Sequence, residues 1–364
     1  MIDTIKLAFY KGEFEIKNYD VFTPSAEVFY QLKTCKKLIK CTCNTSKKEL
    51  AQGLYYPKLT LRNIIQNGVI RLCLFVEFSI PKLMYGNNFE EVCNTDFKDI
   101  IKVLEERLTQ RGIYINSDNI AKSKAIMVHY SKNIELENCR SQFIISKINK
   151  IDAPRKIDTT KSDFKNDGSA IKFHTNSYEL TFYDKVADLK QSLISDKRAI
   201  ENENCIQQDL LVDRLKNKEI LRMEVRLNTT KKIKDILKKE GFIFNELQFK
   251  NVFNIEISKK VLMYFWESYI NKSIASICLC EEDISTIQEK LISAGVKIQD
   301  IYKILGIIAS INESCIANAK NQIKTYNFKK LNKYFDIVYQ DDNYLLSQFK
   351  NIENAILKME AIKL

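Results

Sequence analysis

Hydrophobic and polar residues alternate with a period of two in several stretches of the first 228 residues, as in strands with one buried face. This pattern predicts strands at 3–10, 12–17, 69–80, 125–131, 141–147, 178–184 and 220–228. Residues 96–112 instead place apolar side chains at helical spacing, behind Asp96 as a capping residue. Strands interrupted by helices predict an α+β fold, a central mostly antiparallel sheet with helices on one side.

Beyond residue 228 the apolar spacing becomes helical almost throughout. We predict helices near 257–275, 283–294 and 297–321, and therefore two domains, an α+β domain at 1–228 and an all-helical carboxyl-terminal domain at 229–364. Two segments lack a clear place in this scheme. The polar residues at 150–177 indicate an exposed loop, and the charged residues at 186–218 indicate a connecting helix.

The charge balance adds a partner class to this picture. The formal net charge is +11 and the isoelectric point is about 9.0, which favours a polyanionic partner such as nucleic acid. The alternative is a lysine-rich solvated surface without such a partner. Lysine pairs recur along the chain rather than in one basic tail, so phosphate contacts would be spread out.

Other compositional features exclude some classes of protein. No apolar run approaches the roughly 20 residues needed to span a bilayer, and the amino terminus lacks the pattern of a secretory signal. We therefore expect a cytoplasmic protein with no membrane partner. The ten cysteines are scattered and only two histidines are present, which argues against structural zinc and for reduced, buried thiols.

Four predicted strands carry ionisable side chains on their polar faces. If these strands are neighbours, period-two alternation places the following residues on one face of the sheet: Glu77, His129, Tyr183, Lys185, Arg222, Glu224 and Arg226. In the strand around His129, this reading sets the histidine opposite Ile126, Val128 and Tyr130.

Three of these residues form a candidate metal site. Glu77, His129 and Glu224 offer two carboxylates and an imidazole, which suit Mg²⁺ or Mn²⁺ and leave coordination positions open for a phosphate oxygen. Arg222 and Arg226 can hold phosphates through bidentate hydrogen bonds. Taken singly, each has a structural alternative: a solvated glutamate, a hydrogen-bonded histidine, and a salt-bridge ladder along Arg-x-Glu-x-Arg.

Tyr183 and Lys185 form a candidate catalytic pair. A phenol has a pKa near 10, so at neutral pH it needs a nearby positive charge or proton acceptor to act as a nucleophile. Lys185, two residues further along the strand, would supply that charge or stabilise a pentavalent transition state. The structural alternative is an ordinary amphipathic strand end, because Tyr-x-Lys is common in strands.

At these residues the chain resembles the gene II/X replication initiator family of filamentous phages and plasmids. The segments that carry the resemblance are Met1–Asp3, Val76–Phe89, Thr95–Phe97, Val128–Ile134, Phe182–Lys185 and Leu221–Leu227. The resemblance continues weakly into the helical end and so extends over most of the chain in order. Its most specific parts are the block Glu77–Phe89 and Tyr-x-Lys followed by Arg-x-Glu. Lys82 and Lys132 lie within the segments that carry the resemblance, and we assign both to DNA binding together with Arg222 and Arg226.

The resemblance implies a rolling-circle initiator, similar in reaction to the HUH endonucleases. Such a protein nicks one strand of a supercoiled origin, forms a 5′-phosphotyrosine through Tyr183, frees a 3′-hydroxyl primer and later recloses the strand. Its expected partner is origin DNA in duplex and single-stranded form, in the cytoplasm of a bacterial host. The resemblance is also compatible with a host helicase and polymerase as partners and with an oligomer on the DNA. The chain lacks the His-hydrophobic-His motif of the wider superfamily, so its metal ligands are inferred without a motif match. The alternatives are a non-catalytic origin-binding protein or repressor and a mobilisation relaxase.

Overall fold

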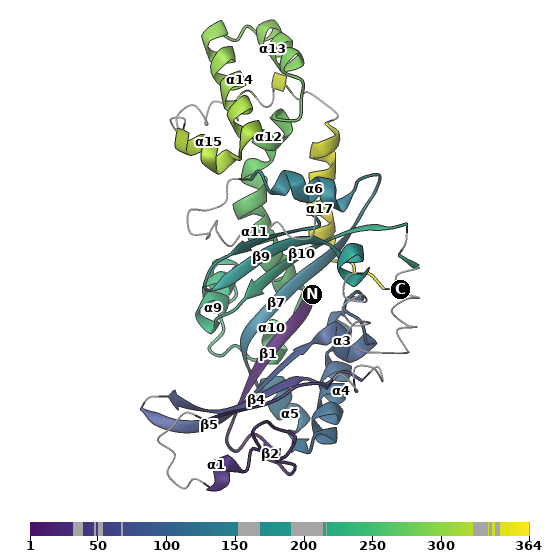
Figure 1. Cartoon of the computed structure of the whole chain (residues 1–364), viewed down its shortest axis with the longest axis vertical. Coiled ribbons are helices and arrows are strands. Elements are labelled where there is room, and N and C mark those ends of the chain that lie inside the picture. Colours follow the sequence, from purple (N-terminus) through teal and green to yellow (C-terminus); the bar gives the residue numbers. More distant parts are fainter. Residues whose placement is uncertain are drawn as a thin grey trace.

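An antiparallel sheet of eight strands organises the computed structural model (Figure 1). The structure describes residues 1–31, 39–46, 54–66, 68–151, 168–190, 217–322 and 343–363, with isolated positions at 49, 214, 215, 334, 337 and 338. The strand order is β3-β4-β5-β1-β7-β10-β9-β8, and every pair is antiparallel. The strands are β1 (Ile2–Tyr10), β3 (Lys40–Cys43), β4 (Lys58–Gln66), β5 (Val69–Ser79), β7 (Lys124–Leu136), β8 (Ala170–His174), β9 (Tyr178–Asp184) and β10 (Glu219–Leu227).

One face of the sheet is apolar and covered by helices. Alternate residues of β1, β5, β7 and β10 point into a continuous core, for example Leu7, Val76, Val128 and Val225. The helices that contribute buried side chains to it include α3 (Ile80–Tyr85), α4 (Phe97–Gln110), α5 (Ser117–Lys122), α6 (Ser141–Ile148), α9 (Thr230–Lys239), α10 (Phe249–Val252), α11 (Ile255–Phe265) and α17 (Tyr344–Lys358). The predicted mixed architecture with a large antiparallel sheet is thus confirmed.

The carboxyl-terminal helices divide between the sheet and a projection. Helices α9, α11 and α17 contact β7 or β10 directly. A helical tower extends away from them (Figure 1), made of a π-helical turn at Trp266–Asn271, α12 (Lys272–Leu279), α13 (Ile284–Ser293), α14 (Ile298–Glu313) and α15 (Ile316–Gln322). The helices predicted near 283–294 and 297–321 are present, the latter in two pieces. A separate domain at 229–364 stays a prediction.

Several other predicted elements differ from the structure. Residues 141–147 form helix α6 rather than a strand, because Ile144, Ile145 and Ile148 share one helical face that packs under β8 and β9. The predicted strand at 12–17 is reduced to β2 (Glu15–Ile16), which pairs with β6 (Ile113–Tyr114), and short helices occupy Val28–Gln31 and Asn94–Asp96. The predicted loop at 150–177 contains strand β8, while most of it, like most of the predicted helix at 186–218, lies outside the described residues.

Candidate metal and tyrosine site

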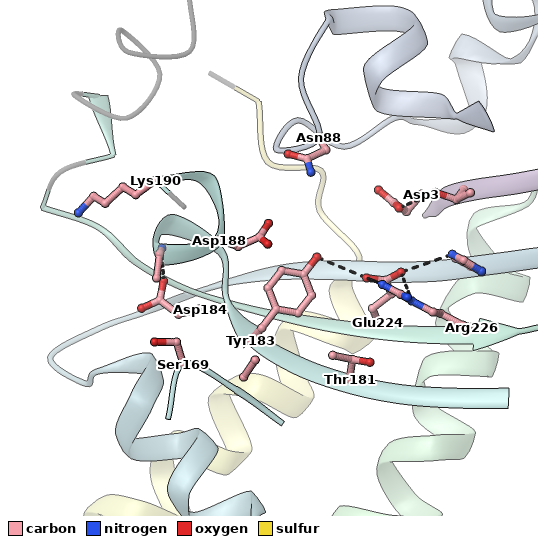
Figure 2. A pocket seen from close by; sticks show the side chains of 14 residues that line it. Asp3, Asn88, Ser169, Thr181, Tyr183, Asp184, Asp188, Lys190, Glu224 and Arg226 are labelled. Carbon is pink, nitrogen blue, oxygen red and sulfur yellow. Dashed lines mark hydrogen bonds and ion pairs between the residues drawn. The ribbon is translucent and has the colours of Figure 1, made fainter. Parts of the chain in front are cut away.

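A pocket of about 760 Å³ opens on the other face of the sheet (Figure 2). Its walls come from five adjacent strands, β1, β7, β10, β9 and β8, together with a loop that contributes Asn88 and a helical turn that contributes Asp188. In Figure 2 the Tyr183 side chain points across the pocket towards Glu224, with Asp3 on the far side. The predicted polar face therefore exists, and it is hollowed.

Asp3, His129 and Glu224 form a group that could hold a metal ion. Each offers one ligand atom, and these atoms lie within 4.8 Å of one another. His129 Nδ1 is 3.5 Å from Glu224 Oε1, while its Nε2 is buried without a hydrogen-bond partner among the described residues. Two carboxylates and a neutral imidazole suit a divalent cation such as Mg²⁺ or Mn²⁺. The donor set and the unpaired ring nitrogen both fit a cation.

Irregular strand pairing places Ile126 on the same face of the sheet as His129. The pairing of β1 with β7 shifts register between Lys6 and Leu7, which is the sign of a β-bulge. As a result Ile126 packs with an apolar patch on the same face as the pocket, whereas Val128 and Tyr130 point into the core. The expectation that His129 lies opposite Ile126 was therefore wrong, although its predicted place on the polar face is correct.

The sequence reading missed Asp3 and misassigned Arg222. Arg222 is 2% exposed, and its guanidinium donates hydrogen bonds to Asp3 Oδ1 at 2.6 Å and to Ser131 Oγ at 2.9 Å. Burial raises the pKa of Asp3, but the charges of Arg222 and then Lys185 outweigh it and set the pKa below its ordinary value. Arg222 is thus an internal counter-ion for a candidate ligand and is not placed to contact DNA.

Glu77 lies outside the metal-capable group. Its carboxylate is 2.9 Å from Lys6 Nζ, because Lys6 and Glu77 are direct cross-strand partners on β1 and β5. His129 instead faces Thr4 on the opposite side of β1. Glu77 therefore lies on β5, on the side of β1 away from His129. The second carboxylate of the metal-capable group comes from Asp3, whereas the sequence predicted Glu77.

Tyr183 lies beside the metal-capable group. Its hydroxyl donates to Glu224 Oε2 at 3.4 Å. Burial raises the pKa of Tyr183 well above its ordinary value, Arg222 opposes this, and the carboxylates of Glu224 and Asp188 reinforce it. The phenol is therefore protonated in the absence of an added cation, and positive charge at the group would favour its ionised form.

Lys185 is close to Tyr183, but in a different setting from the one predicted. Strand β9 ends at Asp184, and Lys185 begins a helical turn, where its side chain is fully buried. Its Nζ lies 5.4 Å from the centre of the Tyr183 ring and 3.0 Å from Asp188 Oδ2. Burial, and then Arg222, lower the pKa of Lys185 to about 8. Lys185 thus faces the ring of the tyrosine rather than extending along the strand beside it.

Arg226 joins two carboxylates at the edge of the pocket. Its Nε is 2.9 Å from Glu224 Oε1, and its NH1 is 3.5 Å from Glu179 Oε2. The second histidine, His174, also contacts Glu179, at 3.0 Å, so it lies on the far side of Arg226 from the metal-capable group. Because the Arg226 side chain is 35% exposed, it can still reach a ligand in the pocket.

The two lysines assigned to DNA binding differ in exposure. Lys82 is exposed on α3, as a phosphate contact requires. Lys132 is 3% exposed, and its Nζ pairs with Glu91 Oε2 at 2.7 Å. Lys132 therefore balances an internal carboxylate, and the assignment to DNA contact was wrong.

Two aromatic residues of the carboxyl-terminal helices pack against the sheet and its helices. The Trp266 side chain is fully buried between Phe182 and Phe349. Tyr269 is stacked on Phe265 at 5.7 Å, and its hydroxyl is hydrogen-bonded to that of Tyr178. Both residues belong to the packing between the sheet and its helices.

Comparisons with known proteins leave the family open. No family model matches the chain, and neither curated proteins nor solved structures give a significant match. Within the described ranges, no helix has both the length and the apolar character needed to cross a membrane.

Proposed function

We propose that this protein is a metal-dependent DNA nicking and strand-transfer enzyme that initiates rolling-circle replication of a phage or plasmid. One observation carries the proposal: a tyrosine hydroxyl lies 3.4 Å from a carboxylate that belongs to a metal-capable group, inside one pocket. The net charge of +11 adds support, since the substrate is a polyanion. The sequence resemblance to the phage and plasmid initiators selects the same tyrosine.

The chemistry assigned to Tyr183 is a phosphodiester exchange. Its phenolic oxygen attacks phosphorus and forms a 5′-phosphotyrosine, while the bond to the 3′-oxygen breaks and that oxygen leaves as a hydroxyl after taking up a proton. Glu224 Oε2 already accepts the phenolic hydrogen bond and is placed to take its proton. The reverse attack by a 3′-hydroxyl reseals the strand, so closure needs no nucleotide cofactor.

The remaining pocket residues would stabilise charge and position the substrate. A divalent cation held by Asp3, His129 and Glu224 would neutralise charge on the phosphate oxygens. Arg226, partly exposed at the rim, would hold a neighbouring phosphate. Lys185, over the Tyr183 ring, would favour the phenolate. An HUH-like arrangement of the sheet, a DNA-binding role for the helical tower and host replication proteins as partners belong to the same proposal.

Formation of the covalent adduct is the decisive test. Supercoiled plasmid carrying the DNA that flanks the gene would be incubated with protein and Mn²⁺, and protein-linked 5′ label would be measured before and after protease treatment. Wild type should give an adduct and Tyr183→Phe should give none. Tyr10→Phe is the matched control, because Tyr10 lies on the same sheet face outside the pocket.

The same assay tests Glu224 as a metal ligand. Glu224→Gln should abolish cleavage and leave duplex binding intact.

An adduct of normal yield from Tyr183→Phe would refute Tyr183 as the nucleophile. Duplex binding by wild type without any adduct would instead support a non-catalytic origin-binding protein.

A further inference from the structure

The hairpin of β4 and β5 extends beyond the rest of the sheet as a two-stranded arm (Figure 1). The β1 ladder on β5 ends at the pair Tyr10–Cys73, and the β3 ladder on β4 ends at Lys40–Arg62. Beyond them β4 and β5 continue to pair with each other up to Gln66–Val69. A two-stranded ribbon on its own is marginally stable in water, so an arm of this kind suggests a binding role.

The end of the arm is apolar and exposed. Ile65 is 65% exposed, Val69 54% and Ile70 45%. Ile65 and Ile70 are direct cross-strand partners on the face of the arm opposite to the pocket face, whereas Val69 lies on the pocket-face side, so the tip carries exposed apolar side chains on both faces. Such a cluster on an otherwise charged protein marks an interaction site.

The side of the arm that continues the pocket face is basic. Period-two alternation from Glu77 through Phe75 places Arg71 on that face, and cross-strand pairing adds three further cations. The four exposed cations on this side are Lys40, Lys58, Arg62 and Arg71. Between residues 58 and 79 the only acidic residue is Glu77, which is paired with Lys6. The partner of this side is therefore an anion.

The length of the arm matches a duplex partner. Thr4, next to the candidate ligand Asp3, faces Ser79, and Val69 lies ten residues further along the same strand. At about 3.3 Å per residue, the tip lies roughly 33 Å from the pocket end of β5. One turn of B-DNA is about 34 Å long, so a duplex that leaves the pocket along this face would meet the tip after one turn.

We propose that the β4–β5 arm clamps duplex DNA beside the cleavage site and that its apolar tip inserts at a base step. This inference rests on the proposed nicking function. The four cations take backbone phosphates, and Ile65, Val69 and Ile70 unstack the step, as apolar wedges do in proteins that kink DNA. The arm thereby supplies the unpaired segment that a tyrosine in a pocket needs in order to reach a phosphodiester.

The test separates duplex opening from cleavage. A tip variant, I65S/V69S/I70S, and a charge variant, R62S/R71S, would be compared with wild type for nicking of supercoiled plasmid and of the same strand as a single-stranded oligonucleotide. The control variants are Ile298→Ser and Lys297→Ser at the start of α14, in the helical tower far from the arm (Figure 1). Ile298 is 50% exposed, close to Ile70 in exposure. Thermal melts would check that every variant folds.

The tip variant should lose about tenfold or more in duplex nicking, because unstacking one step costs a few kcal/mol that the wedge must supply. Its cleavage of the single strand should stay at the wild-type rate. The charge variant should weaken duplex binding and reduce the salt dependence of the affinity by about two phosphate contacts. The control variants should match wild type in every measurement.

Permanganate footprinting in the Tyr183→Phe background tests the arm without cleavage. Reactive, unpaired thymines should appear with an intact arm and disappear with the tip variant. Unchanged footprints and unchanged duplex nicking in the tip variant would overturn the proposal. So would a difference in sedimentation between the DNA-free tip variant and DNA-free wild type, because that result would show that the tip contacts a second copy of the chain. The absence of a covalent adduct with wild type would refute the proposed chemistry. The footprint would still measure independently whether the arm opens duplex DNA.

Discussion

Replacing Arg222 with Met should destabilise the fold rather than weaken DNA binding. The guanidinium is 2% exposed and donates to Asp3, to Ser131 and, at 2.8 Å, to the carbonyl oxygen of Asn88. Its removal leaves the Asp3 carboxylate without its cation at a position where burial alone raises the pKa. Breaking a buried ion pair from one side costs about 3 to 5 kcal/mol. For a chain of 364 residues, that predicts a fall in apparent Tm of about 4 to 7 °C.

The pairing with Asp3 can be isolated by a double-mutant cycle. Asp3→Asn should destabilise the protein on its own, and Asp3→Asn with Arg222→Met should cost less than the sum, with a coupling of about 1 to 3 kcal/mol. The pH dependence has a defined sign. The pKa of Asp3 is lower in the folded than in the unfolded state, so its contribution is present above about pH 4 and is lost as the pH falls through the folded pKa. The difference between wild type and Arg222→Met should therefore narrow in acid.

Circular dichroism melts and duplex-binding titrations of the same preparations distinguish an internal role of Arg222 from a DNA contact. Arg71→Met is the matched control, since Arg71 is exposed on the arm and its loss should leave the Tm within a degree or so of wild type. If Arg222→Met melts like wild type but loses affinity for DNA, Arg222 contacts phosphate and the internal role given to it is refuted.

Three further predictions concern the site and the core. The pKa of Lys185 is lowered to about 8 in the folded state, so the unfolded state keeps this proton to higher pH. Wild type should therefore gain stability relative to Lys185→Met between about pH 8 and 10.5. Parallel profiles of Tm against pH for the two proteins would contradict this. Trp266→Ala should cost about 3 to 5 kcal/mol in stability and leave DNA affinity per folded molecule unchanged, as measured by melts and binding titrations. Loss of affinity without destabilisation would contradict this structural role. Added Mn²⁺ should raise the Tm of wild type by mass action but not that of Glu224→Gln, and an equal rise in both would remove Glu224 from the metal-capable group.

Alternation gave the strands of the site because each has one fully buried face. β9 and the Leu221–Leu227 part of β10 each keep an unbroken period of two over seven residues, so Tyr183 and Glu224 could be placed on one face before their neighbours were known. Strand β4 escaped recognition because its alternation ends at the adjacent pair Ile64 and Ile65, where the strand leaves the core and no buried face constrains its pattern.

Other errors came from properties that period two does not encode. Asp3 reaches the pocket through the irregular pairing of β1 and β7, a feature of two strands together. Arg222 and Lys132 look like surface cations in sequence, and only the position of Asp3 and Glu91 shows that they are internal counter-ions. Charged side chains on central strands are rarely buried unless they are paired, so the position of both residues in the middle of the sheet argues against a DNA contact.

The order of strands also has a consequence for biosynthesis. Asp3 lies on β1 and Glu224 on β10, so the metal-capable group joins positions separated by 221 residues. Long-range pairing of this kind is slow, because the chain between the partners loses conformational entropy before the contacts form and offset that loss. A ribosome-bound chain therefore carries β1 without Glu224 until a further 221 residues have been synthesised. Until then the metal-capable group lacks one of its two carboxylates.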